Sequence, residues 1–256
     1  MTNYELIRYS MKDIMTGVDG VFHMACLARV QPSIDNPMLY HDKNVNGLVN
    51  MLDACRRYNI KRFVFSSSSS IYGDAEELPT SETSRLHAMS PYALHKLVGE
   101  QYCKLYSELY GIETICLRYF NVYGERQVLE GAYCLVMGIF AQQMLEGKPM
   151  TIRGDGEQRR DFTHVDDVIE ANLLSATSDE IFDDVVKCRA FNIGNGDNRS
   201  VNQIADLIGG DRDTVDPVIE PKETLADNKK AKEMLGWEPK GNLEEWIPKW
   251  KEDLGL

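Results

Sequence analysis

A run of serines and a tyrosine–lysine pair are the residues of this chain best suited to chemistry. The segment RFVFSSSSSIYGD, residues 62–74, starts as an apolar strand and continues into five serines. Further along, SPYALHK places Tyr92 and Lys96 four residues apart, so both side chains share one face of a predicted helix. An ammonium one turn away stabilises a phenolate, which suits Tyr92 to accept a proton from an alcohol. A serine hydroxyl at the strand end could complete the relay to a substrate.

The serine run also has an alternative interpretation as a flexible, solvated linker. A Tyr-x-x-x-Lys pair alone is weak support for chemistry, since any amphipathic helix can contain one by chance. An apolar strand that ends in serines, followed about 24 residues later by Ser-Pro-Tyr-x-x-x-Lys, is far more specific. The combination favours a row of hydroxyls that faces a substrate.

The elements that must position these residues form two strand–helix–strand units. GVFHMAC (20–26) and RFVFSS (62–67) are short apolar runs typical of strands covered on both faces. Residues 44–59 between them have helical apolar spacing, which makes a βαβ unit and predicts a parallel sheet. A helix over 90–111 and a strand over 112–124 follow, with Pro91 beside Ser90 as the helix start and Gly111 as its stop.

The second half of the chain alternates differently and predicts a smaller lobe. Beyond residue 124 the sequence predicts a helix over 133–147, a short strand PMTIRG and a polar loop DGEQRRDF. A helix HVDDVIEANLLSAT, a strand RAFNIGNG, a helix SVNQIADLIG and two final helices complete the pattern.

Composition excludes several classes of protein. With 43% hydrophobic and 27% charged residues among 256, the chain is globular rather than disordered. A net charge of −12 argues against nucleic acid or an anionic membrane surface as partner. The six cysteines are scattered without a C-x-x-C pair, so they indicate core thiols in a reducing compartment and no metal site. No membrane span or signal peptide is found, which predicts a cytoplasmic protein.

The ordered motifs together resemble the extended short-chain dehydrogenase/reductase family. The similarity is closest to the NAD-dependent epimerases and dehydratases, in particular UDP-glucose and UDP-N-acetylglucosamine 4-epimerases. The segments that carry it are GVDGVFHMACLARVQPSIDNP, NVNGLVNMLDAC, FVFSSSSSIYGD, SPYALHK, LRYFNVYGERQ, IRGDGEQRRDFTHVDDV, FNIGNG and LADNKKAKEMLGWEP.

The resemblance implies an α/β fold with two parts. Residues 1–124 would form part of a Rossmann-like, doubly wound parallel sheet that binds NAD. Residues 125–256 would form mainly a smaller α/β substrate lobe, with 160–195 partly returning to the sheet. The helices 44–59 and 90–111 are apolar on more than one side, and in the family this pair forms the four-helix bundle of a homodimer.

The resemblance also implies roles for individual residues in the epimerisation of a sugar nucleotide at C4. Tyr92 would be the base, Lys96 its electrostatic partner, and Ser68 the serine that hydrogen-bonds the sugar 4-oxygen. Ser66 and Ser67 would line the cofactor side of the strand end. The residues expected to contact NAD are Ala25, Asn44, Ser66, Tyr92, Lys96 and Tyr119. Those expected to contact the UDP-sugar are Ser68, Tyr92, Asn121, Arg153, Arg160 and Thr224, where a small residue such as Thr224 would admit an N-acetyl group.

Ser69 and Ser70 distinguish the predicted epimerase activity from two related activities. Related 4,6-dehydratases carry Asp-Glu at these positions, and UDP-glucuronate decarboxylases carry Glu at the second. Two serines cannot perform acid–base elimination at neutral pH, so the epimerase is favoured over a nucleotide-sugar dehydratase or decarboxylase.

One family feature is missing from the chain. The family opens with a strand, a Gly-x-x-Gly-x-x-Gly turn and a helix that binds the pyrophosphate, whereas YELIRYSMKDI aligns with the family's third strand. The strand at residues 20–25 is therefore expected at a sheet edge. We expect a truncated frame, a separate polypeptide that supplies the segment, or a degenerate relative. The last would be a non-catalytic protein that binds nucleotide sugars or acts in assembly.

Overall fold

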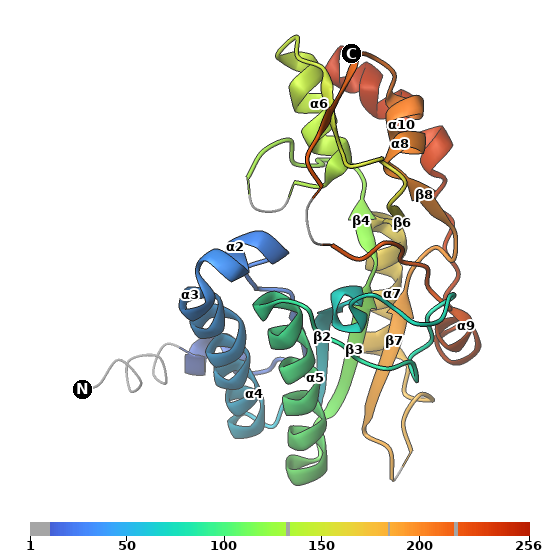
Figure 1. Cartoon of the computed structure of the whole chain (residues 1–256). Helices are drawn as coiled ribbons and strands as arrows, with labels where there is room; N and C mark the ends of the chain where they lie inside the picture. The colour runs from blue at the N-terminus through green and yellow to red at the C-terminus, as the bar shows by residue number, and fades with distance from the viewer. Residues whose placement is uncertain (1–10, 132–133, 184, 218–219) are drawn as a thin grey trace.

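The main sheet has four parallel strands with helices on both faces (Figure 1). The computed structural model describes residues 11–131, 134–183, 185–217 and 220–256. In spatial order the strands are β1 (Gly20–His23), β2 (Arg62–Ser68), β3 (Glu113–Tyr119) and β7 (Cys188–Ile193). The predicted α/β class with a parallel Rossmann-like sheet is confirmed.

Successive side chains of β2 point to opposite faces of this sheet. Phe63 and Phe65 belong to a core cluster with the α4 and α5 side chains, whereas Val64 packs with residues of α7 and α9 on the other face. The helices on the first side are α2 (Val30–Asp35), α3 (Pro37–His41), the π-helical turn η1 (Asp42–Asn46), α4 (Gly47–Arg57) and α5 (Pro91–Tyr110). Those on the second side are α7 (Val165–Thr177) and α9 (Lys229–Leu235).

A smaller lobe stands beyond the carboxyl ends of the strands (Figure 1). Its core contains Phe140, Ile204, Trp246 and Trp250, and the two tryptophan rings stack at 5.0 Å. The elements of this lobe are β4 (Asn121–Tyr123), α6 (Val136–Leu145), β5 (Met150–Arg153), β6 (Arg159–His164), β8 (Asn198–Ser200), α8 (Val201–Ile208), β9 (Arg212–Val215) and α10 (Leu243–Leu254). No described helix has both the length and the apolar character needed to cross a bilayer.

The expected boundaries of α5 are confirmed. The Ser90 side chain accepts a hydrogen bond from the Ala93 amide, and Pro91 occupies the first turn. Gly111 ends the helix with φ 72°, in the left-handed region that glycine adopts without strain. These caps fix where Tyr92 and Lys96 lie along the chain.

The structure departs from the expected elements in several places. The predicted strand over 112–124 divides into β3 and β4, which belong to different sheets. β6 begins at Arg159, inside the segment predicted as a polar loop, and β9 was not predicted. β6 is held by pairing with β4 and β8 rather than by an apolar alternation, which is the signal that sequence reasoning uses.

The expected sheet edge is confirmed among the described residues. There β1 pairs only with β2, and Phe22 and Met24 are 44% and 55% exposed. Most of YELIRYSMKDI, the segment expected to align with the family's third strand, lies outside the described residues, and Met11 belongs to a helical turn over 11–15.

Candidate active site

Helix α5 approaches β2 closely enough to bring Lys96 onto the strand. Gly99, one turn after Lys96, faces Phe65, and a Cβ at Gly99 would lie 2.5 Å from the Phe65 ring. Only glycine permits this approach without displacing the ring. The first turns of α5 therefore sit over the carboxyl end of β2.

Lys96 is a buried cation whose contacts are defined on several sides. Its side chain is 3% exposed, and its Nζ donates to the Ser66 carbonyl at 2.5 Å. The ammonium lies 5.1 Å from the Phe65 ring centre and 5.8 Å from that of Tyr92. Burial works against this charge, but Tyr92 and Cys26 hold the pKa of Lys96 above its ordinary value. Lys96 is thus a permanent positive charge beside Tyr92.

Tyr92 is anchored through its backbone and leaves its ring partly exposed. Its amide donates to the Ser33 hydroxyl of α2 at 3.1 Å, which connects the start of α5 to α2. The structure therefore places Tyr92 and Lys96 side by side, with the Lys96 ammonium at the end of β2.

The serines at the end of β2 alternate in what they face. Ser66 is 3.2 Å from the Tyr119 hydroxyl, which in turn donates to Asn172 at 3.0 Å. Burial raises the pKa of Tyr119, so its hydroxyl stays neutral. Ser67 differs from the expectation, because its hydroxyl donates to Glu100 of α5 at 2.5 Å and is 2% exposed. Ser67 belongs to the packing of α5.

Ser68 lies at the last position of β2 and caps the 3₁₀ turn η2 (Ser69–Tyr72). Its hydroxyl accepts a hydrogen bond from the Ser70 amide at 3.2 Å, and it shares no hydrogen bond with Tyr92 within the described chain. The Ser70 hydroxyl is buried without a partner among the described atoms. One serine is therefore partly exposed at the site and the other is enclosed.

The loop after β1 is fixed by Asn44. The Asn44 side chain accepts from the Leu27 amide at 2.7 Å and donates to the Leu27 carbonyl at 2.9 Å. Ala25 lies exposed in the same loop. A buried ammonium, a neutral hydroxyl at Tyr119 and an exposed loop fit the ribose side of a nicotinamide cofactor. The glycine-rich turn for a pyrophosphate is not found in the sequence.

The other four residues expected to contact the sugar nucleotide lie on the smaller lobe and on residues 220–228, a segment here called the strap, which bonds to β6 and to the residues after β7. Arg160 pairs with Glu220 at 2.5 Å, and its side chain is 14% exposed. Asn121 donates to the Asp161 carbonyl, and the Thr224 hydroxyl accepts from the Asp161 amide. β6 thus gathers three of the four residues, whereas Arg153 lies exposed on β5, in a separate sheet.

Asp161 is a structural carboxylate that the sequence analysis missed. It is fully buried and accepts hydrogen bonds from the amides of Asn195, Gly196 and Ala226 at 2.7, 3.0 and 3.0 Å. Burial raises its pKa to about 6 despite these donors. The charge pattern in RRDF gave no signal for this role, because the partners are more than thirty residues away.

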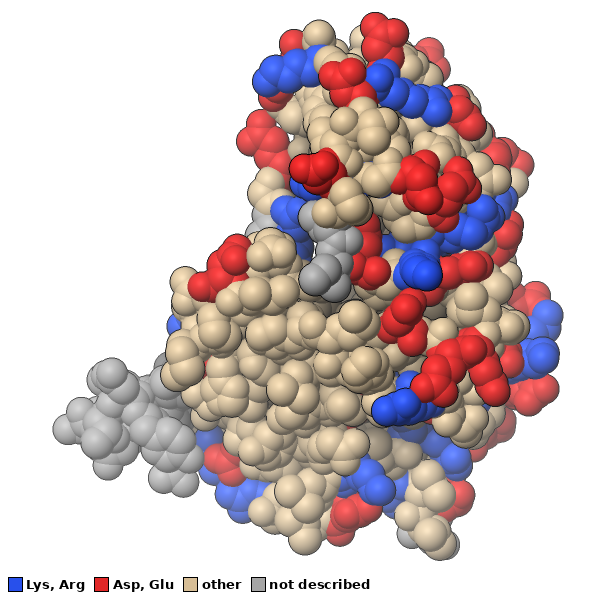
Figure 2. Space-filling view, viewed as in Figure 1, with Lys and Arg blue, Asp and Glu red and all other residues tan. Residues whose placement is uncertain are grey.

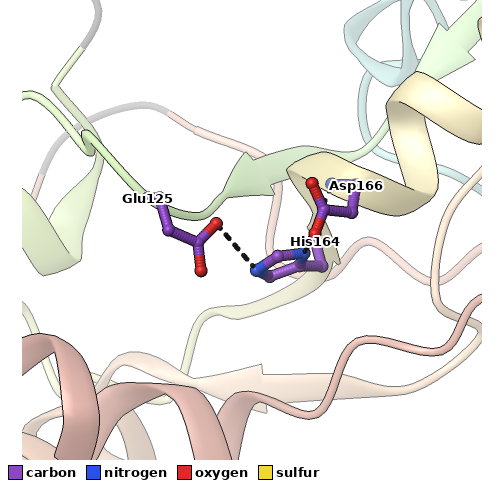
Figure 3. A group of neighbouring side chains, drawn as sticks. All are labelled: Glu125, His164 and Asp166. Atoms are coloured by element: carbon purple, nitrogen blue, oxygen red, sulfur yellow. Dashed lines mark hydrogen bonds and ion pairs between the residues drawn. The ribbon is translucent and has the colours of Figure 1, made fainter.

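A cluster of Glu125, His164 and Asp166 has the composition of a metal site but not its chemistry (Figure 3). His164 Nδ1 accepts from the Asp166 amide at 3.2 Å, so in a neutral ring the proton is on Nε2. Nε2 faces Glu125 at 3.5 Å. Neither nitrogen then offers a free lone pair, and the cluster is best described as a carboxylate–imidazole contact.

A cavity of about 110 Å³ lies in the smaller lobe, away from Tyr92. Its Arg199 is paired with Asp197 at 2.6 Å and Glu244 at 2.7 Å. The guanidinium is therefore already neutralised. Tyr92 and Lys96 are not among the residues that line this cavity.

The sequence of this chain is similar to those of known proteins. Residues 2–194 match the model of the NAD dependent epimerase/dehydratase family. A candidate UDP-glucose 4-epimerase of Methanocaldococcus jannaschii is 41% identical over 90% of this chain and 75% of its own length. UDP-glucuronic acid decarboxylase 1 of Arabidopsis thaliana is 32% identical over 98% of this chain and 58% of its own.

A solved structure extends the similarity to the fold. The UDP-N-acetylglucosamine 4-epimerase from Methanobrevibacter ruminantium M1, in complex with UDP-N-acetylmuramic acid, has a TM-score of 0.87 at 32% identity. The match covers 97% of this chain and 81% of the other.

Proposed function

The chain belongs to the NAD dependent epimerase/dehydratase family, and from that premise we propose that it inverts C4 of a UDP-hexose or UDP-N-acetylhexosamine. The reaction would pass through a 4-keto intermediate, and the cofactor is NAD. The observation that carries the proposal is the Lys96 ammonium, buried against β2 and beside the Tyr92 ring.

The residues of the chain divide the proton chemistry among them. Tyr92 takes the proton of the sugar 4-hydroxyl and later returns it, while Lys96 stabilises the intervening phenolate. Ser68 orients the 4-oxygen by a hydrogen bond. NAD would supply the hydride acceptor and donor for C4 of the sugar. Ser66, Tyr119 and Asn44 with its loop would hold the cofactor beside Tyr92.

Elimination is disfavoured by the residues after Ser68. Ser69 and Ser70 form η2, and the Ser70 hydroxyl is enclosed and cannot act as an acid or base at neutral pH. Decarboxylases are among the relatives, so release of CO₂ from UDP-glucuronate is the alternative to be measured.

Arg160, Asn121 and Arg153 would bind the UDP portion of the substrate. A diphosphate would compete with Glu220 for the Arg160 guanidinium, since a carboxylate and a phosphate each offer two oxygens that accept paired hydrogen bonds from it. Thr224 is small and is fixed by its bond to β6, which supports a pocket that admits an N-acetyl group. Exclusive use of UDP-glucose would refute that substrate.

We further propose that a glycine-rich βαβ segment, on the same or another polypeptide, completes the cofactor site. The support is the edge position of β1 in the described sheet, with Phe22 and Met24 exposed. Such a segment would pair with this region and cover the apolar side chains.

The test compares purified wild type with Tyr92→Phe, using UDP-glucose and UDP-N-acetylglucosamine as substrates. Bound NAD(H) is measured by absorbance, and the glycine-rich segment of a relative is added in trans. Loss of the phenol should lower kcat by roughly 10²–10⁴-fold. Tyr102→Phe, on the same helix but partly buried against the core cluster of α4 and α5, serves as control.

Two results would contradict the proposal. One is absence of epimerisation with both substrates even when NAD and the added segment are present. If a UDP-sugar then still binds in calorimetry, the non-catalytic alternative is supported. The other is CO₂ release from UDP-glucuronate, which would support a decarboxylase.

A further inference from the structure

A chain of hydrogen bonds leads from helix α7 to the end of β2. The Asn172 amide nitrogen donates to the Val168 carbonyl at 2.7 Å, within the helix. The Asn172 oxygen bonds to the Tyr119 hydroxyl at 3.0 Å, and the Ser66 hydroxyl lies 3.2 Å from that of Tyr119. Ser66 and Asn172 are each 6% exposed, so both ends of this chain of bonds are shielded from water.

The Val168 carbonyl fixes the direction of every bond in this chain. A carbonyl only accepts, so the Asn172 side chain turns its NH₂ group to Val168 and its oxygen to Tyr119. An amide oxygen also only accepts, so the proton of the Tyr119 hydroxyl points to Asn172. Burial raises the pKa of Tyr119, and the hydroxyl therefore keeps that proton. Ser66 is then the donor in its bond with Tyr119.

The Ser66 hydroxyl is left with acceptor capacity alone. A serine hydroxyl has one proton and two lone pairs, and the proton is used in the bond to Tyr119. The Ser66 carbonyl accepts from Lys96, which places this residue at the strand end where the cofactor is proposed to bind. A ligand group that meets the Ser66 oxygen must therefore bring a donor of its own.

We propose that Asn172 is a positioning residue that acts through Tyr119 and makes the Ser66 oxygen an acceptor for an N–H of the nicotinamide carboxamide. The inference rests on the proposed function, because the place of the cofactor beside Tyr92 belongs to that proposal. The carboxamide NH₂ brings two protons, whereas the carboxamide oxygen would meet the Ser66 oxygen with no proton between them. The chain of bonds would therefore select one of the two orientations of the carboxamide.

The first experiment determines where the Tyr119 proton points and needs no cofactor. The full chain, labelled with ¹³Cζ-tyrosine, is followed by NMR in equal volumes of H₂O and D₂O, and Tyr119→Phe identifies the signal. A slowly exchanging hydroxyl gives separate ¹³Cζ lines for OH and OD, and fast exchange merges them. Exchange should be faster in Asn172→Leu and Asn172→Ala than in Ser66→Ala, because the Asn172 variants remove the acceptor of this proton.

Ser175→Ala is the matched control for the Asn172 variants. Ser175 lies three residues further along α7, is fully buried, and its hydroxyl has no partner among the described atoms. Its loss should leave the exchange at Tyr119 as in wild type. Equal exchange in the Asn172 and Ser66 variants, or faster exchange in Ser66→Ala, would overturn the inference whether or not the protein is an enzyme. Two substitutions of Asn172 are used so that misfolding of one does not remove the comparison.

The second experiment compares NAD with 3-acetylpyridine adenine dinucleotide, in which a methyl group replaces the carboxamide NH₂. Calorimetry gives the Kd of each, with the glycine-rich segment of a relative added in trans. Wild type should bind NAD roughly tenfold more tightly, the effect of one hydrogen bond whose acceptor is otherwise left unpaired. In Asn172→Leu the Tyr119 proton can turn to Ser66 and free the serine proton for the ligand, so the ratio should fall to roughly twofold. Ser175→Ala should keep the wild-type ratio.

The two measurements separate the possible failures. If wild type epimerises a sugar nucleotide but binds the two dinucleotides equally, the inference is overturned and the proposed function stands. A ratio that is the same in wild type and in both Asn172 variants has the same meaning. If neither dinucleotide binds and no epimerisation is found, the proposed function fails, and the inference fails with it.

Discussion

Single buried charges set the chemistry of this protein at the scale of the residue. Lys96 keeps its charge in the interior because Tyr92 and the Ser66 carbonyl lie beside it. Its field also reaches His23 of β1, which is 7% exposed and stacks on Phe63 and Phe65. One ammonium therefore lies beside the Tyr92 ring and also opposes an imidazolium at His23.

His23 makes stability depend on pH. Burial, with a smaller contribution from Lys96, lowers its pKa from 6.5 to about 4. Below pH 6.5 the unfolded chain binds a proton that the folded chain does not, so stability is lost as pH falls through 6.5 towards 4. Between pH 8 and 5 we expect a loss of about 2 kcal/mol in the free energy of unfolding from this group.

Urea unfolding at the two pH values measures this contribution as the difference between wild type and His23→Phe. The variant should show the smaller decrease at pH 5. His87→Gln, at an exposed position, should behave as wild type. Equal pH dependence in His23→Phe and wild type would contradict the prediction.

Tyr92 and Lys96 could be recognised from the sequence because both lie on one helix, where spacing alone determines the shared face. Asn172 and Asp161 could not, since their partners come from distant segments and only the packed fold brings them together. Ser67 shows the same limit, because its bond to Glu100 depends on how α5 rests on β2.

At the scale of the element, α5 is held on the sheet by a buried polar network as well as by apolar contacts. Arg118 of β3 makes two bonds to Glu100, at 2.9 and 2.7 Å, and a third to the Tyr72 hydroxyl. Ser67 completes the network from β2. These bonds from β2 and β3 therefore fix the position of α5, the helix on which Tyr92 and Lys96 lie.

Gly99 makes the close contact of α5 possible, and its replacement should be costly. In Gly99→Ala the new Cβ would meet Phe65 at 2.5 Å and Leu48 at 3.0 Å, so the free energy of unfolding should fall by about 1–3 kcal/mol. Activity should fall as well, because the shift moves Lys96 away from Ser66.

Gly47→Ala is the matched control for this prediction. Gly47 also lies on a helix, has an ordinary helical φ of −59°, and a Cβ there meets nothing within 4 Å. It should stabilise the protein by about 0.4–1 kcal/mol. Urea unfolding of both variants checks the pair, and equal effects would show that Gly99 has no special contact.

Element types were largely predictable, whereas their membership in sheets was not. Local sequence is enough to identify β1 and β2 by their apolar runs and α5 by its helical spacing. The break between β3 and β4, one residue long, depends on which partner strand each half meets. β6 carries Arg159, Arg160 and Asp161, so its polar pattern resembles a loop until β4 and β8 pair with it.

At the scale of the whole molecule, the charges are unevenly distributed. Figure 2 shows a broad uncharged surface over α3, α4 and α5, while Lys, Arg, Asp and Glu are dense on the smaller lobe. Apolar side chains are exposed on α5 along its length, with Leu94 at 49%, Leu105 at 44% and Leu109 at 62%. Such a face is typical of a protein–protein interface.

We expect this face to form a homodimer. In the double variant Leu105→Glu, Leu109→Glu, two buried carboxylates would face the same pair in the partner, so the dimer should dissociate. Light scattering on wild type and variant measures the mass in solution. Leu173→Glu, equally exposed at 55% but on α7, should leave the dimer intact. A monomeric wild type would refute the expectation.

The Asp161 carboxylate has a mechanical consequence for the molecule as a whole. Asp161 lies on β6 of the smaller lobe. Its carboxylate accepts hydrogen bonds from the amides of Asn195 and Gly196, just after β7 of the main sheet, and from the amide of Ala226. We therefore expect any movement of the smaller lobe relative to the main sheet to be least near this residue. The amplitude of such a movement should grow with distance from Asp161. It should be largest at the far ends of α6 and α10 and smallest at Asn121 and Thr224.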